Sequence, residues 1–301
     1  MAATAGKVLI SGSSGLVGAA LLPRLTANGW QVTRLIRSDS AGPDQISWDP
    51  SRPIPPESVS GFDAVIHLAG ATIAERWTER KKQAIRDSRV VGTRNIAEAL
   101  AQAAKRPALL LAASAIGFYG DRGDEVLNEE SLGGQGFLAE VCRDWESATQ
   151  PAVQAGIRTV MTRFGIVLSP SGGALAKMLL PFRLGLGGRV GSGRQWWSWV
   201  ALDDVIGAIE YAMKTSTLAG PLNVVSPNPV TNREFTTSLA SALSRPALFP
   251  MPAFAARAAL GQMADELLLA SQRVEPAKLR ASGYRFRRPD LDMALAAILK
   301  R

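Results

Sequence analysis

The sequence predicts an α/β fold, in which a doubly wound parallel sheet is followed by a smaller C-terminal α+β region. Three observations lead to this prediction. An apolar strand, three glycines and an amphipathic helix follow one another in residues 7–25. Strand-like and helix-like segments then alternate as far as residue 165, which is typical of parallel strands joined by helices. Beyond Arg163 the alternation stops, and glycines, prolines and tryptophans become frequent.

The glycines are spaced G-x-x-G-x-x-G directly after the strand predicted at 7–11. Gly12 permits a tight turn, Gly15 lets the backbone approach a pyrophosphate, and Gly18 lets the helix at 16–25 pack against the sheet. Backbone N–H groups and the positive end of the helix dipole then face the phosphates. We expect a dinucleotide site here; the alternative is a glycine-rich loop that serves packing only. The expected cofactor-binding residues of this turn are Gly12, Ser14, Gly15, Leu16, Val17 and Gly18.

The composition describes a globular chain of 301 residues, 47% hydrophobic and 20% charged, which suffices for one or two domains. One cysteine and one histidine exclude an internal disulfide and multi-cysteine or His-rich metal sites, so we expect no metal. No uncharged run is long enough to span a bilayer, and the first residues show no secretory signal. We therefore expect a protein of the reducing cytoplasm without a membrane partner.

The net charge of +8 results from 34 Lys and Arg against 26 Asp and Glu. Such a balance can indicate nucleic-acid binding. Here the arginines are scattered, and no basic run of five residues occurs. We favour a solvated basic surface that attracts anionic ligands, and we expect no nucleic-acid partner.

A second strand is predicted at 31–36, and Arg37 and Ser38 follow its end. In dinucleotide-binding folds an acidic residue at this place holds the ribose 2′-hydroxyl of NAD, whereas an arginine accommodates the 2′-phosphate of NADP. We therefore expect NADP(H) rather than NAD(H), with Arg37 and Ser38 as contacts. Asp39 is a competing residue that would favour NAD(H). The alternative for Arg37 is an ordinary exposed arginine at a strand end.

A short strand at 46–50 contains Asp49, which either accepts a hydrogen bond from the adenine amino group or caps the turn before the proline-rich 52–56. The next strand, at 62–68, leads into small residues that let the backbone lie against a cofactor ribose. His67 lies in this apolar run, and we interpret it as a core histidine rather than a catalyst. The contacts expected from this turn are Leu68, Ala69, Gly70 and Ala71.

The remaining elements continue the alternation and then depart from it. The first half is completed by a helix at 79–104, a strand at 108–114, a helix at 136–155 and a strand at 158–162. The second half contains predicted helices at 172–184, 200–213, 232–243 and 291–299, and a short strand at 222–225. We expect residues 1–165 to form the nucleotide-binding domain and 166–301 a substrate-binding region, some of whose segments return to the first sheet.

Several motifs together carry a resemblance to a known family: GSSGLVG, VIHLAGA, VVGTRNIAEAL, SAIGFYGD and WWSWVALDDV. They resemble the extended short-chain dehydrogenase/reductase superfamily. Further stretches such as RFGIVLSPSGGAL resemble its atypical branch of epimerase-family proteins, related to sugar-nucleotide epimerases. The resemblance covers almost the whole chain. It implies a Rossmann domain that binds NAD(P) and a C-terminal domain that forms the substrate cleft.

One feature of that superfamily is missing. Typical members combine a Ser or Thr at the end of the fifth strand with Tyr-x-x-x-Lys on the next helix, where the lysine tunes the tyrosine for acid–base catalysis. Here Leu138 and Cys142, or Phe137 and Val141, occupy the places of Tyr and Lys. The sequence therefore supports cofactor binding but not the usual proton relay.

The resemblance also suggests residues around the nicotinamide. Ser114 is expected to contact the cofactor and to donate a hydrogen bond to a substrate carbonyl, and Tyr119 to supply a proton; the alternative is that both only shape the pocket. Arg163 and Gly165 are expected along the nicotinamide, and the backbone of Val167 is expected to face its carboxamide.

Three tryptophans, Trp196, Trp197 and Trp199, lie where sugar-nucleotide epimerases bind the substrate diphosphate. They predict either an apolar substrate wall, which suits a less charged substrate, or ordinary core residues. We expect an NADP(H)-dependent oxidoreductase or epimerase-like enzyme that acts on an unidentified small molecule, as a monomer or homodimer. The alternative is a non-catalytic NADP(H)-binding protein with a regulatory or sensing role.

Overall fold

The computed structural model describes residues 5–38 and 41–299, and its central element is a parallel β-sheet. Within these residues the sheet has seven strands in the order β11-β7-β5-β4-β1-β2-β3. They are β1 (Gly6–Ser11), β2 (Trp30–Ile36), β3 (Gln45–Ser47), β4 (Ala64–His67), β5 (Leu109–Ala115), β7 (Arg158–Phe164) and β11 (Gly220–Val224). Each neighbouring pair is parallel. The predicted α/β fold with a doubly wound parallel sheet is confirmed.

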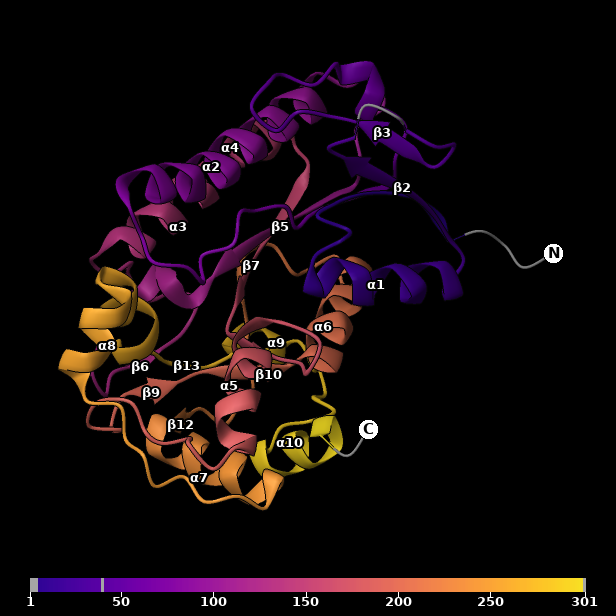
Figure 1. Cartoon of the computed structure of the whole chain (residues 1–301). Coiled ribbons are helices and arrows are strands. Elements are labelled where there is room, and N and C mark those ends of the chain that lie inside the picture. The colour runs from indigo at the N-terminus through magenta and orange to yellow at the C-terminus, as the bar shows by residue number, and fades with distance from the viewer. Residues whose placement is uncertain (1–4, 39–40, 300–301) are drawn as a thin grey trace.

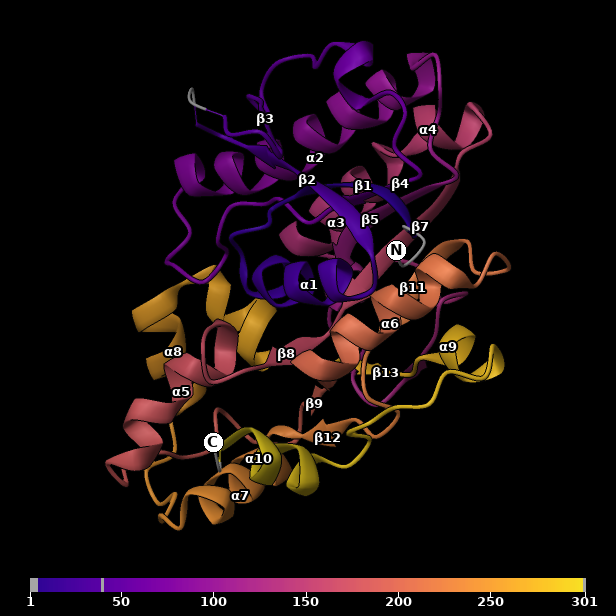
Figure 2. The ribbon, with the colours of Figure 1, turned by 90° about the vertical axis from the view of Figure 1, so that its right-hand side faces the viewer.

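Helices cover both faces of the sheet, as Figures 1 and 2 show. One face carries α2 (Glu79–Gln102), α3 (Phe137–Ser147) and α4 (Gln150–Gln154), and the other carries α1 (Leu16–Ala27) and α6 (Leu202–Lys214). Successive strand side chains point to opposite faces: Leu9 packs in the core below α2, and Ile10 packs in the core with α1 and α6. A strand that is buried on both faces must be apolar throughout, which explains the composition of 7–11.

The strand order reverses direction next to β1. From β1 the chain crosses to β2 and β3 on one side, and it then returns to β4 on the other side. In such sheets ligands bind outside the carboxyl ends of the strands at this switch point. The carboxyl ends of β1 and β4, which pair from Val8–Ala64 to Ser11–His67, are therefore where the fold places a ligand.

The second half of the chain forms a smaller body below the sheet in the view of Figure 1. Its helices are α5 (Gly173–Arg183), α7 (Asn232–Leu243), α8 (Ala253–Leu260), α9 (Ala277–Ala281), α10 (Leu291–Leu299) and the π-helical segment η3 (Ala264–Leu269). Its short strands are β8 (Ile166–Leu168), β9 (Trp196–Trp197), β10 (Trp199–Ala201), β12 (Val230–Thr231) and β13 (Arg273–Val274). Two 3₁₀ turns, η1 (Pro56–Val59) and η2 (Ile116–Tyr119), and strand β6 (Val126–Leu127) complete the list of elements.

This body has its own apolar core but is not separate from the sheet. Leu175 of α5, Phe235 of α7 and Leu295 of α10 pack together in that core. Two of its segments return to the main sheet, because β11 pairs with β7 and α6 covers one face. The functional division at residue 165 stays a prediction. No helix in the described ranges combines the length and the apolar character needed to cross a bilayer.

Two predicted elements differ from the structure. The single helix predicted at 136–155 is the pair α3 and α4, because Pro151 has no N–H to continue the hydrogen bonds of α3 and begins a new helix instead. The helix predicted at 200–213 begins later. Val200 belongs to strand β10, where it pairs with Val167 of β8, and helix α6 starts at Leu202.

His67 closes strand β4 as a fully buried side chain, in agreement with its interpretation as a core residue. Its Nδ1 lies 2.6 Å from Ser11 Oγ, and its ring packs edge-on against Trp48. Its Nε2 has no hydrogen-bond partner among the described residues. Burial without a charge partner disfavours the imidazolium and lowers the pKa of His67 to about 4.

We predict that the imidazole of His67 stays neutral until the pH approaches 4. The pKa of His67 in the folded protein lies below its unfolded value of 6.5. The contribution of the neutral imidazole to the free energy of unfolding is therefore fully present above pH 6.5 and is lost as the pH falls from 6.5 towards 4. By linkage this loss amounts to about 3 kcal/mol. Because His67 is the only histidine, NMR titration of its ring reports it directly. A midpoint near 6.5 would contradict the buried, unpaired placement.

Candidate functional site

The turn between β1 and α1 lies directly against the end of β4. Gly12 has a φ of +68°, and a Cβ there would lie 2.5 Å from the carbonyl carbon of Leu68. A Cβ on Gly18 would lie 2.3 Å from the carbonyl oxygen of Gly12. A side chain fits at neither position, so both residues must be glycine. The turn thereby brings the first residues of α1 to the carboxyl ends of β1 and β4.

The N-terminus of α1 is not capped by the protein. Gly15 is the N-cap residue, no side chain accepts a hydrogen bond from the first turn, and that turn contains no acidic residue. The backbone N–H groups of Leu16 and Val17 belong to the first turn, where intrahelical acceptors are lacking. Ser14 and Gly15 are exposed beside them. This arrangement offers donors and the positive end of a helix dipole to an anion.

The end of β2 adds positive charge near this turn. Arg34 lies on β2 opposite Ile10 of β1. Arg37 is exposed just beyond the strand, and its guanidinium has no hydrogen bond or ion pair with any residue that the structure describes. Ser38 is exposed beside it, and the competing Asp39 lies outside the described residues. An unpaired guanidinium at this place suits a phosphate.

Asp49 follows β3 and is exposed. Its Oδ1 accepts hydrogen bonds from the backbone N–H of Ser51 at 2.8 Å and from the hydroxyl of Ser51 at 2.7 Å. These bonds from Ser51 lower the pKa of Asp49 below its usual value. The residue therefore caps the turn before the proline-rich segment, which was one of the two predicted alternatives. Contact with an adenine stays a prediction.

The loop that follows β4 is fixed by helix α2. The backbone N–H of Ala71 donates to Ser88 Oγ at 3.0 Å, and Arg89 Nη1 donates to the carbonyl oxygen of Ala71 at 3.0 Å. A Cβ on Gly70 would lie 3.3 Å from the Arg89 Cζ. Leu68 and Ala69 lead from the sheet into this loop. The backbone N–H and the carbonyl oxygen of Ala71 are therefore both hydrogen-bonded to side chains of α2.

A buried ion pair lies at the carboxyl ends of β5 and β7. Arg163 of β7 donates from Nε and Nη2 to the two carboxylate oxygens of Glu146 on α3, at 2.7 and 2.8 Å. The two side chains are only 3% and 10% exposed. Ser114 Oγ donates to the same carboxylate at 2.7 Å, and Arg163 Nη1 donates to the hydroxyl of Tyr119 at 2.9 Å. We call Ser114, Tyr119, Glu146 and Arg163 the buried polar cluster.

This cluster changes the roles expected for Tyr119 and Ser114. The Tyr119 side chain is fully buried, its hydroxyl also lies 2.8 Å from both Asn128 O and Asn223 Oδ1, and burial raises its pKa. The expectation that Tyr119 passes a proton to a substrate is therefore corrected. Ser114, which is 2% exposed, gives its proton to Glu146. Only its lone pairs remain for another group, so it is not placed to donate to a substrate carbonyl.

Helix α3 provides no replacement for the missing relay, because it contains neither tyrosine nor lysine. Leu138 and Cys142 are buried on the face that packs against η2, where a Cβ on Gly117 would lie 3.3 Å from Leu138 Cβ and 3.7 Å from Cys142 Sγ. Burial raises the pKa of the Cys142 thiol to about 12. The thiol is therefore protonated and neutral at physiological pH.

The segment after β7 is tightly packed. A Cβ on Gly165 would lie 2.6 Å from the carbonyl oxygen of Ser198, so the chain approaches the residue between β9 and β10 too closely for a side chain. Val167 lies in β8 and is half-buried. The Arg163 side chain is engaged inside the buried polar cluster, so any contact of this segment with a cofactor would come from its backbone or from other residues.

A cavity of about 230 Å³ opens between η2, α3 and the C-terminal region. Glu266 of η3 lines it and accepts hydrogen bonds from the N–H groups of Phe137 and Leu138 at 3.1 and 2.7 Å. It thereby caps α3, whose own N-cap residue is Gly136. The other polar side chains of the lining are Asp121, Gln135, Arg257, Asp265 and Gln272.

The predicted tryptophan wall is not formed. Trp199 is fully buried and Trp197 is 5% exposed, both in the core of the C-terminal body. Trp196 is half-buried; its Nε1 donates to Asp124 Oδ1 at 2.8 Å and Arg273 stacks on its ring. Large aromatic side chains gain most from burial, and the alternative interpretation as core residues holds for Trp197 and Trp199.

The sequence prediction missed Glu146 and Arg89. Both are charged residues at helical spacing inside an apolar stripe: Glu146 follows Cys142 by four positions on α3, and Arg89 follows Ile85 by four positions on α2. A charge inside such a stripe must find a partner or a ligand. That pattern is the signal in the sequence that would have identified them.

The comparisons with known proteins agree with this geometry. A family model described as the NAD dependent epimerase/dehydratase family matches residues 8–225, and one for a domain of unknown function matches residues 251–298. An epimerase family protein of Mycobacterium bovis is 44% identical over 290 residues, covering 96% of both chains.

Two solved structures are also similar. The human epimerase family protein SDR39U1 (isoform 2), crystallised with NADPH, has a TM-score of 0.90 at 34% identity and covers 98% of this chain and 99% of its own. A nucleoside-diphosphate sugar epimerase from Corynebacterium glutamicum has a TM-score of 0.82 at 40% identity, over 98% of this chain and 58% of its own.

We predict that Arg163→Met lowers the free energy of unfolding by about 3–5 kcal/mol, because it leaves the Glu146 carboxylate buried without its cation. Urea unfolding followed by circular dichroism measures the loss. The matched control is Arg24→Met, which removes an ion pair to Glu210 in which the arginine is 44% exposed; such pairs contribute about 0–1 kcal/mol. Equal losses in the two variants would show that the buried pair stabilises the fold no more than the exposed pair does.

Proposed function

This chain belongs to the NAD dependent epimerase/dehydratase family, and we propose that it is an NADP(H)-binding, oxidoreductase-like protein that acts on a small polar molecule. The observation that carries the proposal is the uncapped N-terminus of α1 above a turn in which Gly12 and Gly18 leave no room for a Cβ. The residues present fit a dinucleotide. Similarity to a human protein crystallised with NADPH supports the choice of cofactor.

The cofactor's pyrophosphate would be held by the first turn of α1. Leu16 and Val17 offer backbone N–H groups there, whereas the Gly15 N–H donates to Gly12 O at 3.0 Å. Ser14 and Gly15 are exposed beside them. The helix dipole favours the negative charge. When bound, NADP(H) supplies or takes up a hydride; the chain itself positions it between the β1–α1 turn and the loop after β4.

The 2′-phosphate that distinguishes NADP(H) from NAD(H) would be held by Arg37, with Ser38 beside it. Arg34 adds positive charge from the preceding strand. A guanidinium can form two parallel hydrogen bonds with a phosphate. Contacts from Leu68, Ala69, Gly70 and Ala71 to a ribose, and from Gly165 and Val167 to the nicotinamide, belong to the same proposal. They are supported by the position of both segments at the carboxyl ends of β4 and β7.

The substrate would occupy the cavity between η2, α3 and η3. Its lining contains more carboxylates than cations, with Asp121, Asp265 and Glu266 against Arg257. Arg257 is already paired with Asp265 at 2.7 Å. Such a lining favours a neutral or hydroxyl-bearing molecule over an anionic nucleotide sugar, since a diphosphate would meet like charge.

A second candidate function is non-catalytic binding of NADP(H) for regulation or sensing. The observation that favours it is the buried polar cluster, in which the hydroxyl protons of Ser114 and Tyr119 are already engaged by protein acceptors. Location in the cytoplasm, a monomeric or homodimeric state, and the absence of a nucleic-acid partner are kept as predictions of the same proposal.

We predict that NADPH binds at least about tenfold more tightly than NADH, and that Arg37→Ala removes most of this preference. Hydrogen bonds to charged groups contribute about 1.5–3 kcal/mol each, and only NADPH carries the 2′-phosphate. Isothermal titration calorimetry of both cofactors against both proteins measures the effect.

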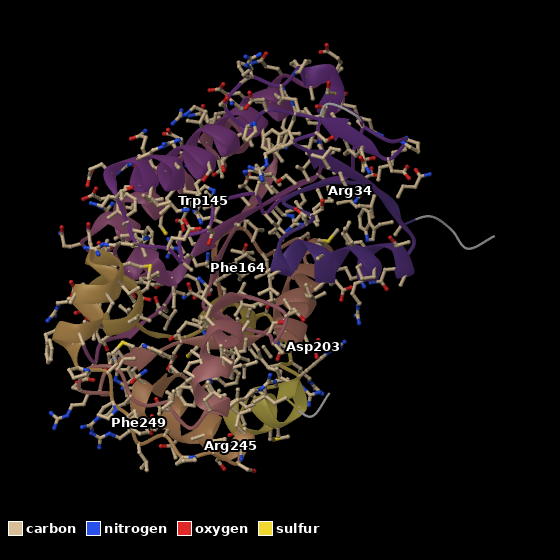
Figure 3. All side chains as sticks on the ribbon, viewed as in Figure 1. Arg34, Trp145, Phe164, Asp203, Arg245 and Phe249 are labelled. Carbon is tan, nitrogen blue, oxygen red and sulfur yellow. The ribbon has the colours of Figure 1, made fainter. Side chains whose placement is uncertain are left out.

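The matched control for this experiment is Arg245→Ala, which removes the same charge from an exposed site. Figure 3 shows Arg245 at the opposite end of the molecule from Arg34 on β2. It should leave both affinities unchanged. Equal affinities of the wild type for NADPH and NADH, or an unaltered NADPH affinity in Arg37→Ala, would show that the assignment of Arg37 is wrong.

We also predict that the purified protein does not interconvert UDP-glucose and UDP-galactose at the rate of a true epimerase. A positioned acid–base group typically contributes about 10²–10⁴ in rate, and α3 presents Leu138 and Cys142 where that pair would lie. The measurement is product formation over time with NADPH or NADP⁺ present. Turnover as fast as a tyrosine–lysine enzyme would refute the prediction.

A further inference from the structure

Arg89 is a desolvated cation at the carboxyl end of β4. Its side chain extends from α2 to the loop after that strand, where Nη1 donates to Ala71 O at 3.0 Å and to Ile85 O at 3.2 Å. Its Cζ lies 5.1 Å from the centre of the Trp145 ring. The guanidinium is therefore enclosed by α2, α3 and the loop, and Figure 3 shows Trp145 in this upper layer of the molecule.

No carboxylate of the described residues neutralises this charge. Two other arginines near α3 are paired with carboxylates, Arg163 with Glu146 and Arg86 with Asp144. The hydrogen bonds of Arg89 are both made by Nη1 to carbonyl oxygens, and no described residue accepts from Nε or Nη2. Burial lowers the pKa of Arg89, which is the expected effect of removing water from an uncompensated cation.

The position of Arg89 relative to the proposed pyrophosphate site indicates which part of a ligand its Nε and Nη2 face. The pyrophosphate is placed at α1 and the adenosine half towards β2, so the other half of a dinucleotide extends past β4 towards β5. Arg89 lies at this point, against Gly70 and beside Cys142. Cys142, the residue of α3 beside Arg89, is a neutral thiol and carries no positive charge.

We propose that Arg89 binds the nicotinamide half of NADP(H), with its Nε and Nη2 donating to ribose hydroxyl oxygens. The inference rests on the proposed function, because it takes the site between α1 and β4 as the cofactor site. Helix α2 would then supply, through Arg89, the cationic donor beside the loop after β4. Gly70 leaves room beside the guanidinium, since a Cβ there would lie 3.3 Å from Arg89 Cζ, closer than an ordinary van der Waals contact.

The test compares two probes by isothermal titration calorimetry with wild type and Arg89→Met, which keeps an unbranched apolar stem and removes the guanidinium with its charge. NADPH contains the nicotinamide ribose, whereas adenosine 2′,5′-bisphosphate lacks it and carries only the adenosine half. Loss of a hydrogen bond from a charged group should weaken NADPH binding at least about tenfold. Binding of the bisphosphate should be unchanged.

The control separates ligand contact from support of the loop. Ser88→Ala removes the other side-chain hydrogen bond to Ala71 and leaves the cation in place. It should weaken NADPH binding much less than Arg89→Met does. If Arg89→Met does not fold, Arg89→Gln makes the same comparison, because it keeps a polar head group and removes the charge and the two-pronged guanidinium.

Three outcomes would overturn the inference: NADPH affinity of wild-type strength in the Arg89 variant, an equal loss for both probes, or an equal loss in Ser88→Ala. The first two place the contact elsewhere, and the third assigns the effect to the loop. If wild type binds the bisphosphate and NADPH with no measurable affinity, the proposed function itself fails, and the inference fails with it.

Discussion

The buried ion pair between Arg163 and Glu146 is the interaction on which the carboxyl edge of the sheet depends. It joins β7 to α3; Ser114 of β5 donates a further hydrogen bond to Glu146, and Tyr119 of η2 accepts one from Arg163. A buried pair compensates its desolvation only when such additional bonds are present. The two hydroxyls therefore belong to the scaffold, and their engagement is the condition under which two charges can lie inside the protein.

This arrangement redistributes charge around the site. The face of α3 towards η2 is neutral, because Leu138 is apolar and the Cys142 thiol is protonated. Glu146 and Arg163 cancel one another. Arg89 reaches this edge from α2, and none of the described carboxylates pairs with it. Helix α3 contains no lysine, and the positive charge of Arg89 beside the loop after β4 comes from α2.

Whether the sequence could predict a feature depends on how far apart in the chain the residues that form it lie. The β1–glycine–α1 unit is local, so spacing alone predicted it, and the resemblance to epimerase-family proteins is confirmed by the family and structural matches. Trp199 is a core residue because it packs with α7 and α10, which lie far away in the chain. No local sequence pattern distinguishes a tryptophan in a cavity wall from one in a core. Glu146 and Arg89 interrupt apolar stripes, but the residues that neutralise or surround them come from other elements.

The C-terminal region completes the site by capping helix α3. Gly136 offers no side chain to the first turn of this helix, and Glu266, more than a hundred residues later, accepts from the N–H groups of Phe137 and Leu138. A carboxylate at a helix N-terminus is stabilising by about 0.3–1 kcal/mol. The same carboxylate lines the cavity, and the π-helical turn that carries it is a conformation that often marks functional sites. A ligand that displaced Glu266 from these N–H groups would therefore also remove the cap of α3, the helix that carries Glu146 of the buried polar cluster.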